Sequence, residues 1–569
     1  MIVIDDWPEA GMKRFALLFL LFAVQPLIRG VVTATDGTPL PGVTVTLDGH
    51  SAVVTDAQGR FSIATTPGQH TLTAQLAGYG TAMHSINVPA SGAVDVELAL
   101  NPVVSEALVV TAQRAPRTTT TAYYAPILEH EWKDTGRNRV TTFSIDVDGA
   151  SYANVRRFLN ADEAPPADAV RIEEMINYFA YRYPEPTDGR PIAISSEVAG
   201  CPWAPEHRLM RVGLRGRTVE QWKLAPNNLV FLLDVSGSME PEDRLPLVKR
   251  ALAYLVGQLR GDDTASIVVY AGAAGVVLPK TSDKDMILAA LDKLGAGGST
   301  AGGEGIELAY KLAEESFLPN GNNRVILATD GDFNVGITEI KDLEKLIESK
   351  RKRGIYLTCI GVGDDNLNDG MMEMLAGKGN GNYYYLDSFD EAKKVFGREL
   401  VSTLVAVADD VKLQLEFDPA MVRSYRQIGY EDRVLANEDF ADDSKDAGEI
   451  GSGQSVTALY ELAMNPGAGT GCVATLRVRY KDPGAAASKE MTARIVDDGR
   501  SAWDASPDTQ FAAAVAEMGM LLRNSPHSGR ASWKDVAALA RATRGEDLDN
   551  TRGELLKLAE IARVAGAKN

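Results

Sequence analysis

The stretch LVFLLDVSGS, residues 229–238, is a fully apolar run that ends in an acid and two serines. A strand without polar positions is buried on both faces, as in parallel sheets that helices cover on both sides. Similar runs follow: SIVVY at 266–270, VVLP at 276–279, RVILAT at 324–329, IYLTCI at 355–360 and YYYL at 383–386. Apolar residues also recur at helical spacing, at Leu245, Val248, Leu252, Leu255 and Leu259. The pattern predicts a doubly wound, Rossmann-like α/β domain over residues 226–402.

Oxygen-bearing side chains directly follow these strands. In a doubly wound sheet, ligands bind beyond the carboxyl ends of the strands, where the strand order reverses. Asp234, Ser236 and Ser238 follow the first strand, Asp330 follows RVILAT, and Thr300 ends the loop GGST before a helix. Mg²⁺ prefers about six oxygen ligands and keeps waters where protein ligands are few. These five residues therefore predict a site for Mg²⁺, with Mn²⁺ or Ca²⁺ as alternatives.

The predicted ligand set also suggests how such an ion would act. Two carboxylates neutralise a divalent cation only formally, so the ion keeps its affinity for one more negative oxygen. We expect that oxygen to come from an Asp or Glu of a partner protein. Replacing Asp234 by alanine should then remove the ion at little cost to the fold, because the side chain is an ion ligand and not a packed group.

The order of these motifs resembles a known family. DVSGS, then GGST, then ILATDGDFNVG is similar to the von Willebrand factor type A domain with its metal-ion-dependent adhesion site. The resemblance implies that Ser236, Ser238 and Thr300 bind the ion directly, and that Asp234 and Asp330 bind it directly or through water. It implies a protein-binding function. A metal-free polar rim, as in relatives that have lost the ion, is the alternative.

Sequences on both sides extend the resemblance over residues 139–569. FSIDVDGASYANVRRFLN, VRIEEMINYF and FAAAVAEMGMLLR look like the bacterial YfbK-type von Willebrand proteins, which have flanking domains of their own. We expect a flanking domain at 139–225 with a helix near 170–179, and a β-rich antiparallel domain at 403–499. Residues 500–569 are predicted to be helical, with Phe511, Val515, Met518 and Leu522 on one face and Ser532 with Asp535 as a helix cap.

The first hundred residues contain a different kind of domain. Residues 28–100 alternate apolar and polar positions between DGTP, DAQG and PGQ turns, which predicts an all-β module. The segment resembles the carboxypeptidase regulatory-like β-sandwich. Residues 101–138 lose periodicity and are predicted to be a linker. Within them, Glu106–Arg114 resembles the box through which outer-membrane receptors contact TonB, although the last strand of the sandwich running into its linker explains it better.

Residues 1–24 suggest export. The apolar run Phe15–Val24 follows Lys13 and Arg14 and is too short to span a bilayer, as in a signal peptide that starts at Met12. A buried N-terminal strand is the alternative. We expect a location in the periplasm or cell envelope, and no transmembrane span beyond this leader. The formal net charge of -19 argues against nucleic acid as a partner, because the chain repels a phosphate backbone.

Enzymatic chemistry has little support in the sequence. The six histidines all lie outside residues 226–402, so no Ser-His-Asp arrangement can form there, and no zinc or phosphate-loop motif is present. We expect no catalytic residues and no nucleotide cofactor. Cys359 fits a buried thiol, and Cys201 and Cys472 allow a pair without requiring one. Two other functions stay open: an envelope assembly factor that acts through its β-sandwich and flanking domains without metal, and a cofactor of an intracellular AAA-type ATPase.

Overall fold

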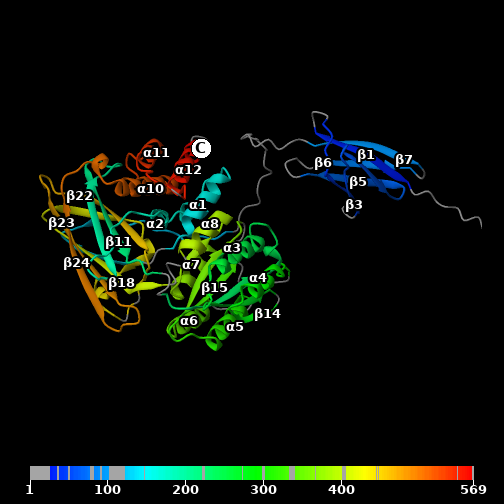
Figure 1. Ribbon diagram of the computed structural model, residues 1–569. Coiled ribbons are helices and arrows are strands. Elements are labelled where there is room, and N and C mark those ends of the chain that lie inside the picture. Colours follow the sequence, from blue (N-terminus) through cyan, green and yellow to red (C-terminus); the bar gives the residue numbers. More distant parts are fainter. Residues whose placement is uncertain are drawn as a thin grey trace, which may run out of the picture. The chain divides into compact units, whose positions relative to one another are not determined.

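The structure, a computed structural model, describes residues 26–34, 38–48, 51–76, 82–89, 92–100, 122–145, 148–220, 224–271, 273–297, 302–331, 340–364, 367–399, 405–443, 445, 447–547 and 549–566. The chain divides into two compact units, Met1–Pro116 and Arg117–Asn569, here called the N-terminal unit and the main unit (Figure 1). The predicted leader, Glu106–Arg114 and Thr300 lie outside the described residues.

The N-terminal unit is a β-sandwich. One sheet has the order β4-β1-β7 and the other the order β3-β2-β5-β6. Their bounds are β1 Leu27–Ala34, β2 Thr44–Leu47, β3 Ser51–Val54, β4 Arg60–Ala64, β5 Gly68–Gln75, β6 Ala82–Val88 and β7 Ala93–Leu100. Alternate residues such as Phe61, Ile63, Val96 and Leu98 point inward and form one apolar core. The alternation seen in the sequence is therefore the in-and-out pattern of a sandwich.

The central sheet of the main unit has the order β14-β13-β12-β15-β16-β17. Its strands are β12 Asn227–Asp234, β13 Thr264–Tyr270, β14 Ala274–Thr281, β15 Asn322–Thr329, β16 Ile355–Gly361 and β17 Tyr383–Tyr385. All neighbours pair in parallel except β13 and β14, which are antiparallel. The strand order reverses between β12 and β15, because the chain first builds β13 and β14 on one side and then the other strands on the opposite side.

One strand differs from its prediction. The run VVLP, read as a strand buried on both faces, lies in the edge strand β14, where Val276 and Val277 are 45% and 41% exposed. An apolar run of that length does not reveal whether a strand is central or at an edge, since both can be rich in β-branched residues.

Helices cover both faces of this sheet, as in the predicted doubly wound α/β fold. On one face pack α3 (Leu245–Gln258), α4 (Lys284–Asp292) and α8 (Phe389–Lys394), followed by a π-helical turn at Val395–Glu399. The opposite face is covered by α5 (Gly302–Glu315), α6 (Ile340–Arg351) and α7 (Asp369–Lys378). Ala150 and Ala153 of α1, Ala150–Asn160, also belong to this second core. The sheet is therefore covered in part by a helix from outside residues 226–402.

The two flanking regions form a single β-sandwich and not two separate domains. One sheet is β10-β11-β22-β19-β8, and the other is β20-β9-β18-β23-β24 with β21 beside β18 (Figure 1). The bounds are β8 Lys133–Asp134, β9 Val140–Ser144, β10 Ile192–Gly200, β11 His207–Gly216, β18 Ala406–Phe417, β19 Val422–Ile428, β20 Val434–Leu435, β21 Ile450–Gly451, β22 Ser455–Met464, β23 Gly471–Lys481 and β24 Ser488–Asp497. Strands from before and after the α/β region thus share one core.

The predicted linker is shorter than expected at its C-terminal end. Strand β8 pairs with β19, and Tyr123 forms a parallel bridge with Asn368 at the start of α7. Residues 122–138 therefore belong to the main unit. The segment has no regular apolar face, and it is bound to the domain through backbone pairing and through single side chains such as Tyr124, which is buried against Phe158 and Ala169.

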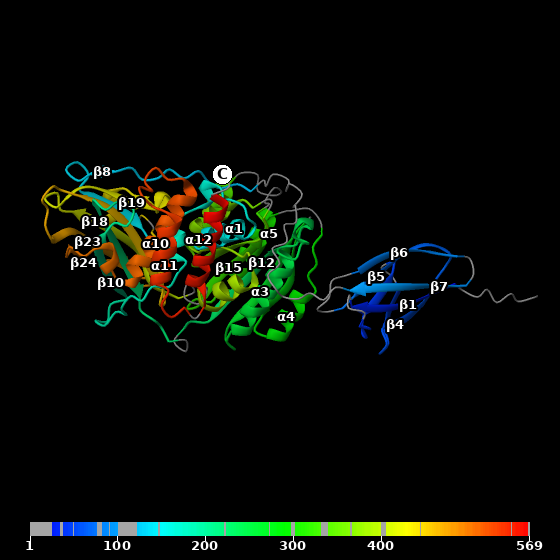
Figure 2. The ribbon, with the colours of Figure 1, turned by 90° about the horizontal axis from the view of Figure 1, so that it is seen from above.

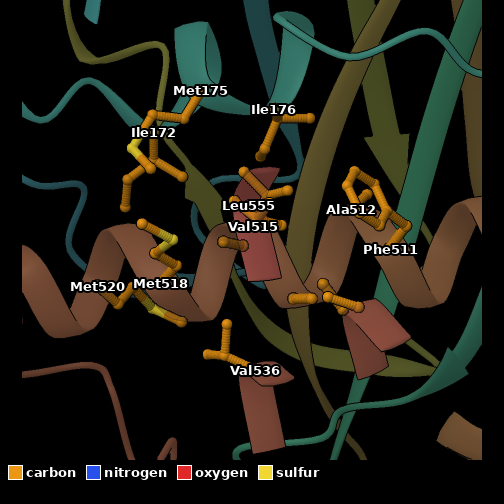
Figure 3. Packing of buried hydrophobic residues seen from close by; sticks show 14 of the residues in the cluster. Ile172, Met175, Ile176, Phe511, Ala512, Val515, Met518, Met520, Val536 and Leu555 are labelled. Carbon is orange, nitrogen blue, oxygen red and sulfur yellow. The ribbon is translucent and has the colours of Figure 1, made fainter. Parts of the chain in front are cut away.

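Helix α10, Pro507–Arg523, is the centre of a helical layer. In Figure 3, Ile172, Met175 and Ile176 of α2 (Ile172–Asn177) lie on one side of α10, and Val536 of α11 (Trp533–Ala542) lies on the other. Helix α12, Thr551–Gly566, packs on α11 and α1 (Figure 2). The C-terminal helices and the helices of residues 139–225 thus share one core.

Buried ion pairs join α1 and α2 to the α/β region. The guanidinium of Arg156 pairs with Asp387 and Glu391, and that of Arg171 lies 2.7 Å from Asp369. The three cysteines are free thiols, with Cys359 fully buried. No helix within the described residues is long and apolar enough to span a bilayer.

Candidate metal-binding site

Asp234 and Asp330 meet at the point where the strand order of the sheet reverses. Asp234 is the last residue of β12, and Asp330 directly follows β15, the neighbouring parallel strand. Both carboxylates are fully buried. The topology therefore brings together, at one edge, two acids that are far apart in the sequence, at the place where such sheets bind ligands.

The Asp234 carboxylate is held by two hydrogen bonds. Its Oδ1 accepts from the backbone N–H of Ser236 at 2.9 Å, and its Oδ2 accepts from the Thr329 hydroxyl at 2.9 Å. Burial raises the pKa of Asp234, although these hydrogen bonds oppose that shift. A buried carboxylate with a raised pKa is costly to ionise, and a bound cation would offset that cost.

The two serines lie side by side. The Oγ atoms of Ser236 and Ser238 are 3.0 Å apart, across a short 3₁₀ turn at Gly237–Met239. Ser236 is buried and Ser238 is half-buried. Two hydroxyl oxygens at this separation can bind one cation together, so the DxSxS segment brings its alternate side chains to one place.

Within the described residues, one carboxylate oxygen of Asp330 accepts a hydrogen bond and the other accepts none. Its Oδ2 accepts a hydrogen bond from Arg244 at 2.8 Å. Its Oδ1 is buried and has no hydrogen-bond partner among the residues that the structure describes. Leaving a buried charged oxygen unsatisfied is expensive, and a cation would satisfy it. With the neighbouring carboxylate and hydroxyls, the donor set therefore fits a small hard cation.

Arg244 is part of the site, and the sequence reading did not identify it. It directly precedes α3, is only 5% exposed, and donates to the carbonyl oxygen of Ser238 at 2.7 Å as well as to Asp330. Its guanidinium packs on Gly363, where a Cβ would approach Nε to 2.6 Å. An arginine shortly after DxSxS resembles any surface residue at a helix start, so sequence alone carries no signal for this role.

The guanidinium also changes the charge of the site. With a divalent ion bound to both ionised carboxylates, Arg244 leaves one positive charge in excess. Such a site attracts a further carboxylate more strongly than a neutral one would.

Four of the five predicted ligands are described, and they lie on the loops that follow β12 and β15, the two strands between which the order reverses; that they bind an ion stays a prediction. The fifth, Thr300, lies outside the described residues, so its part in the site stays a prediction. The preceding loop does reach the site, because the N–H of Gly297 donates to the carbonyl oxygen of Val235 at 2.7 Å.

A second group of acids lies elsewhere in the main unit. Asp148, Glu174 and Glu373 place one oxygen each within 4.8 Å of one another. Arg433 lies 3.1 Å from Asp148 and 3.2 Å from Glu373, and Arg171 pairs with Glu174. The arginines supply the positive charge that these acids need, so this cluster is an ion-pair network between domains.

Four family descriptions match successive parts of the chain. Residues 27–101 match the carboxypeptidase regulatory-like domain, and residues 118–211 match von Willebrand factor. Residues 228–398 match the von Willebrand factor type A domain, and residues 402–564 match the C-terminal domain of the uncharacterized protein YfbK. The first and the last two matches confirm the resemblances found in the sequence. Type A domains typically mediate protein interactions.

Two relatives are similar to this chain in sequence, one over most of its length and one over about a quarter of it. The uncharacterized protein YfbK of Escherichia coli K12 is 41% identical over 473 residues, which are 78% of this chain and 81% of that protein. Inter-alpha-trypsin inhibitor heavy chain H4 of Sus scrofa is 28% identical over 154 residues, 26% of this chain and 17% of the inhibitor.

Among solved structures, the von Willebrand factor type A protein of Catenulispora acidiphila is 17% identical, with a TM-score of 0.40, over 65% of this chain and 91% of its own. BatB of Bacteroides thetaiotaomicron is 26% identical, with a TM-score of 0.27, over 31% of this chain and 98% of its own. By the identity and coverage of its Escherichia coli relative, this chain belongs to the YfbK family of von Willebrand factor type A domain proteins.

Proposed function

We propose that this protein is a divalent-metal-dependent binding module of the bacterial cell envelope, which holds an Asp or Glu of a partner protein through Mg²⁺ or a similar ion. The observation that supports this most is the buried Oδ1 of Asp330, which has no hydrogen-bond partner among the described residues and lies beside Asp234 and the two serine hydroxyls. The positive charge of Arg244 favours a carboxylate as the additional ligand.

A role in binding, without catalysis, fits the chemistry of the site. Its donors are carboxylates and hydroxyls, none of the six histidines lies in residues 226–402, and no general base is therefore available from a histidine of that region. The envelope location rests on the basic and apolar leader and on the carboxypeptidase regulatory-like domain, whose relatives are common in exported bacterial proteins.

The test has two steps. Mn²⁺ binding to the full chain is measured first by calorimetry, for wild type, Asp330→Asn and the exposed control Asp342→Asn on α6. Affinity capture from envelope extracts then uses the same three proteins in Mg²⁺ and in EDTA. We expect partners that are lost in EDTA and with Asp330→Asn but kept by the control. Equal capture by all three proteins in both buffers would contradict the proposal.

One observation favours a second candidate, an assembly factor that binds through its N-terminal β-sandwich. That sandwich forms a compact unit with its own core. Deleting residues 28–100 while keeping the metal site separates the two functions. Partners lost with this deletion but kept by Asp330→Asn would support the second candidate, and the reverse would support the first.

A further inference from the structure

A cavity of about 480 Å³ opens beside the proposed metal site, between α3 and α4. Met239 and Glu240, which directly follow Ser238, form part of its wall, and so do Gly295 and Ala296, which precede Gly297. The loop after β12 and the loop after α4 therefore contribute both to the cavity and to the surroundings of the metal site. A partner chain bound at the ion would need only a few residues, at about 3.3 Å each, to reach it.

The walls of this cavity are largely aliphatic. Leu245, Leu288, Leu291 and Leu294 all line it. Leu288 is 37% exposed, although its helix α4 has a buried face formed by Ile287 and Leu291. An apolar side chain that covers a partly exposed leucine in a concave, apolar surface removes apolar area from water, which stabilises the complex.

Charged groups at the cavity restrict what can bind. The ammonium of Lys249 already donates to the carbonyl oxygens of Asp292 and Leu294, at 2.7 and 2.9 Å, so it holds the wall together. Glu240 and Glu242 are exposed at the rim and have no ion pair within the described residues. Asp292 and Arg250 also line the cavity, so three acids face two basic residues there, and this balance disfavours a polyanionic ligand and favours a lysine or arginine.

We propose that the cavity is the second half of the ligand site and receives a large aliphatic side chain of the partner polypeptide, a few residues from the carboxylate that binds the ion. A lysine or arginine of the same segment faces Glu240 and Glu242. This inference rests on the proposed function and names the chemistry of the partner: one acid, one nearby aliphatic residue and a basic residue.

The probe is a random dodecapeptide display library, selected on the full chain in millimolar Mg²⁺ and eluted with EDTA. We expect the eluted peptides to be enriched in Leu, Ile or Met close to an acid. Synthetic peptides then lose affinity roughly ten- to a hundredfold when that aliphatic residue becomes Ser.

A matched pair of variants on α4 tests the cavity. Leu288→Asn removes an apolar wall residue without adding charge, and Met286→Asn makes a comparable change at a residue that is 52% exposed and does not line the cavity. Leu288→Asn should weaken the selected peptides about tenfold. Met286→Asn should leave their affinity within about twofold of wild type.

The possible failures can be told apart. If no peptide depends on Mg²⁺, the proposed function itself fails. Mg²⁺-dependent acidic peptides without an aliphatic preference, bound equally by Leu288→Asn, would overturn this inference and leave the proposed function standing. Peptides that match segments of this chain would show that the partner is a second copy of the same protein. Aliphatic peptides that stay bound in EDTA would show that the cavity binds without the ion, and they would overturn the inference that the two form one ligand site.

Discussion

At the scale of single residues, the structure revises what a change at Asp234 should do. The sequence suggested a small cost for Asp234→Ala, but the carboxylate accepts hydrogen bonds from Ser236 and Thr329 in a fully buried place. Alanine leaves two buried donors unsatisfied and should cost about 1–3 kcal/mol. Asp234→Asn keeps an acceptor and removes a buried charge, so its stability in EDTA should stay within about 1 kcal/mol of wild type.

Both Asp234 variants should fail to bind Mn²⁺, because each lacks the carboxylate. Urea unfolding in EDTA and calorimetry with Mn²⁺ separate the two effects. Wild-type Mn²⁺ affinity in Asp234→Asn would contradict the assignment of this residue as an ion ligand.

Arg244 gives a second prediction at this scale. Its side chain and that of Asp330 are 6% and 0% exposed, so Arg244→Met leaves a buried carboxylate without its partner. Breaking a buried pair in this way costs about 3–5 kcal/mol. A cation can replace part of the lost charge, so Mg²⁺ should raise the melting temperature of Arg244→Met more than that of wild type.

Arg250→Met on α3, the helix that Arg244 precedes, serves as the control, because Arg250 is exposed. Its melting temperature should respond to Mg²⁺ as wild type does. The same Mg²⁺ response in all three proteins would show that Arg244 and the ion do not act on the same carboxylate.

At the scale of elements, helix α10 carries a buried acid that makes stability depend on pH. Both carboxylate oxygens of Glu517 lack a hydrogen-bond partner within the described part of the chain, and burial raises its pKa to about 8, from an ordinary value of 4.5. The folded protein therefore keeps a proton that the unfolded chain releases. The stability linked to this proton is complete below about pH 4.5 and is lost as the pH rises through about 8.

Glu517→Gln cannot lose a proton, so its melting temperature should fall less than that of wild type between about pH 6 and pH 9. Glu173 on α2, whose pKa burial also raises to about 8, contributes in the same direction. The melting temperature of the double variant with Glu173→Gln should therefore depend on pH even less. The exposed Glu546→Gln is the control. Parallel curves for wild type and Glu517→Gln would exclude Glu517 as a source of the pH dependence.

At the scale of the whole molecule, the α/β region depends on its flanks. Residues 226–402 alone lose Arg156 and Arg171, the partners of the buried acids Glu391 and Asp369, and the cover that α1 provides for one face of the sheet. Each broken buried pair costs about 3–5 kcal/mol, a large part of the stability of an ordinary domain. We expect this fragment not to unfold cooperatively.

Residues 117–569 keep all of these contacts and should unfold in a cooperative transition by circular dichroism. The comparison separates dependence on the flanks from instability of the whole protein. A soluble, monomeric fragment of residues 226–402 that unfolds cooperatively and binds Mn²⁺ like the full chain would contradict the prediction.

The sequence by itself determined the elements and most of the candidate site. Largely apolar runs identified the strands of the central sheet, because a strand covered on both faces needs few polar positions, although the same signal did not distinguish the edge strand β14 from a central one. Local chemistry also identified the start of α11, where Ser532 accepts from the N–H of Asp535 as predicted. Asp234, Ser236, Ser238 and Asp330 were found because each ends or follows a strand, and parallel strands end at a common edge.

Only the tertiary structure decided which strands share a sheet and which polar residues are buried. Alternation identifies the faces of a strand but not its partner. The pairing of β11 with β22, which follows the α/β region in the sequence, could therefore not be predicted. In the sequence, Arg244 is an ordinary residue at a helix start and Glu517 an ordinary helix residue. Their roles depend on Asp330, which is distant along the chain, and on the packing of α2 and α11 around α10. Burial and pairing of such side chains depend on which elements pack together, and that information is spread over the whole chain.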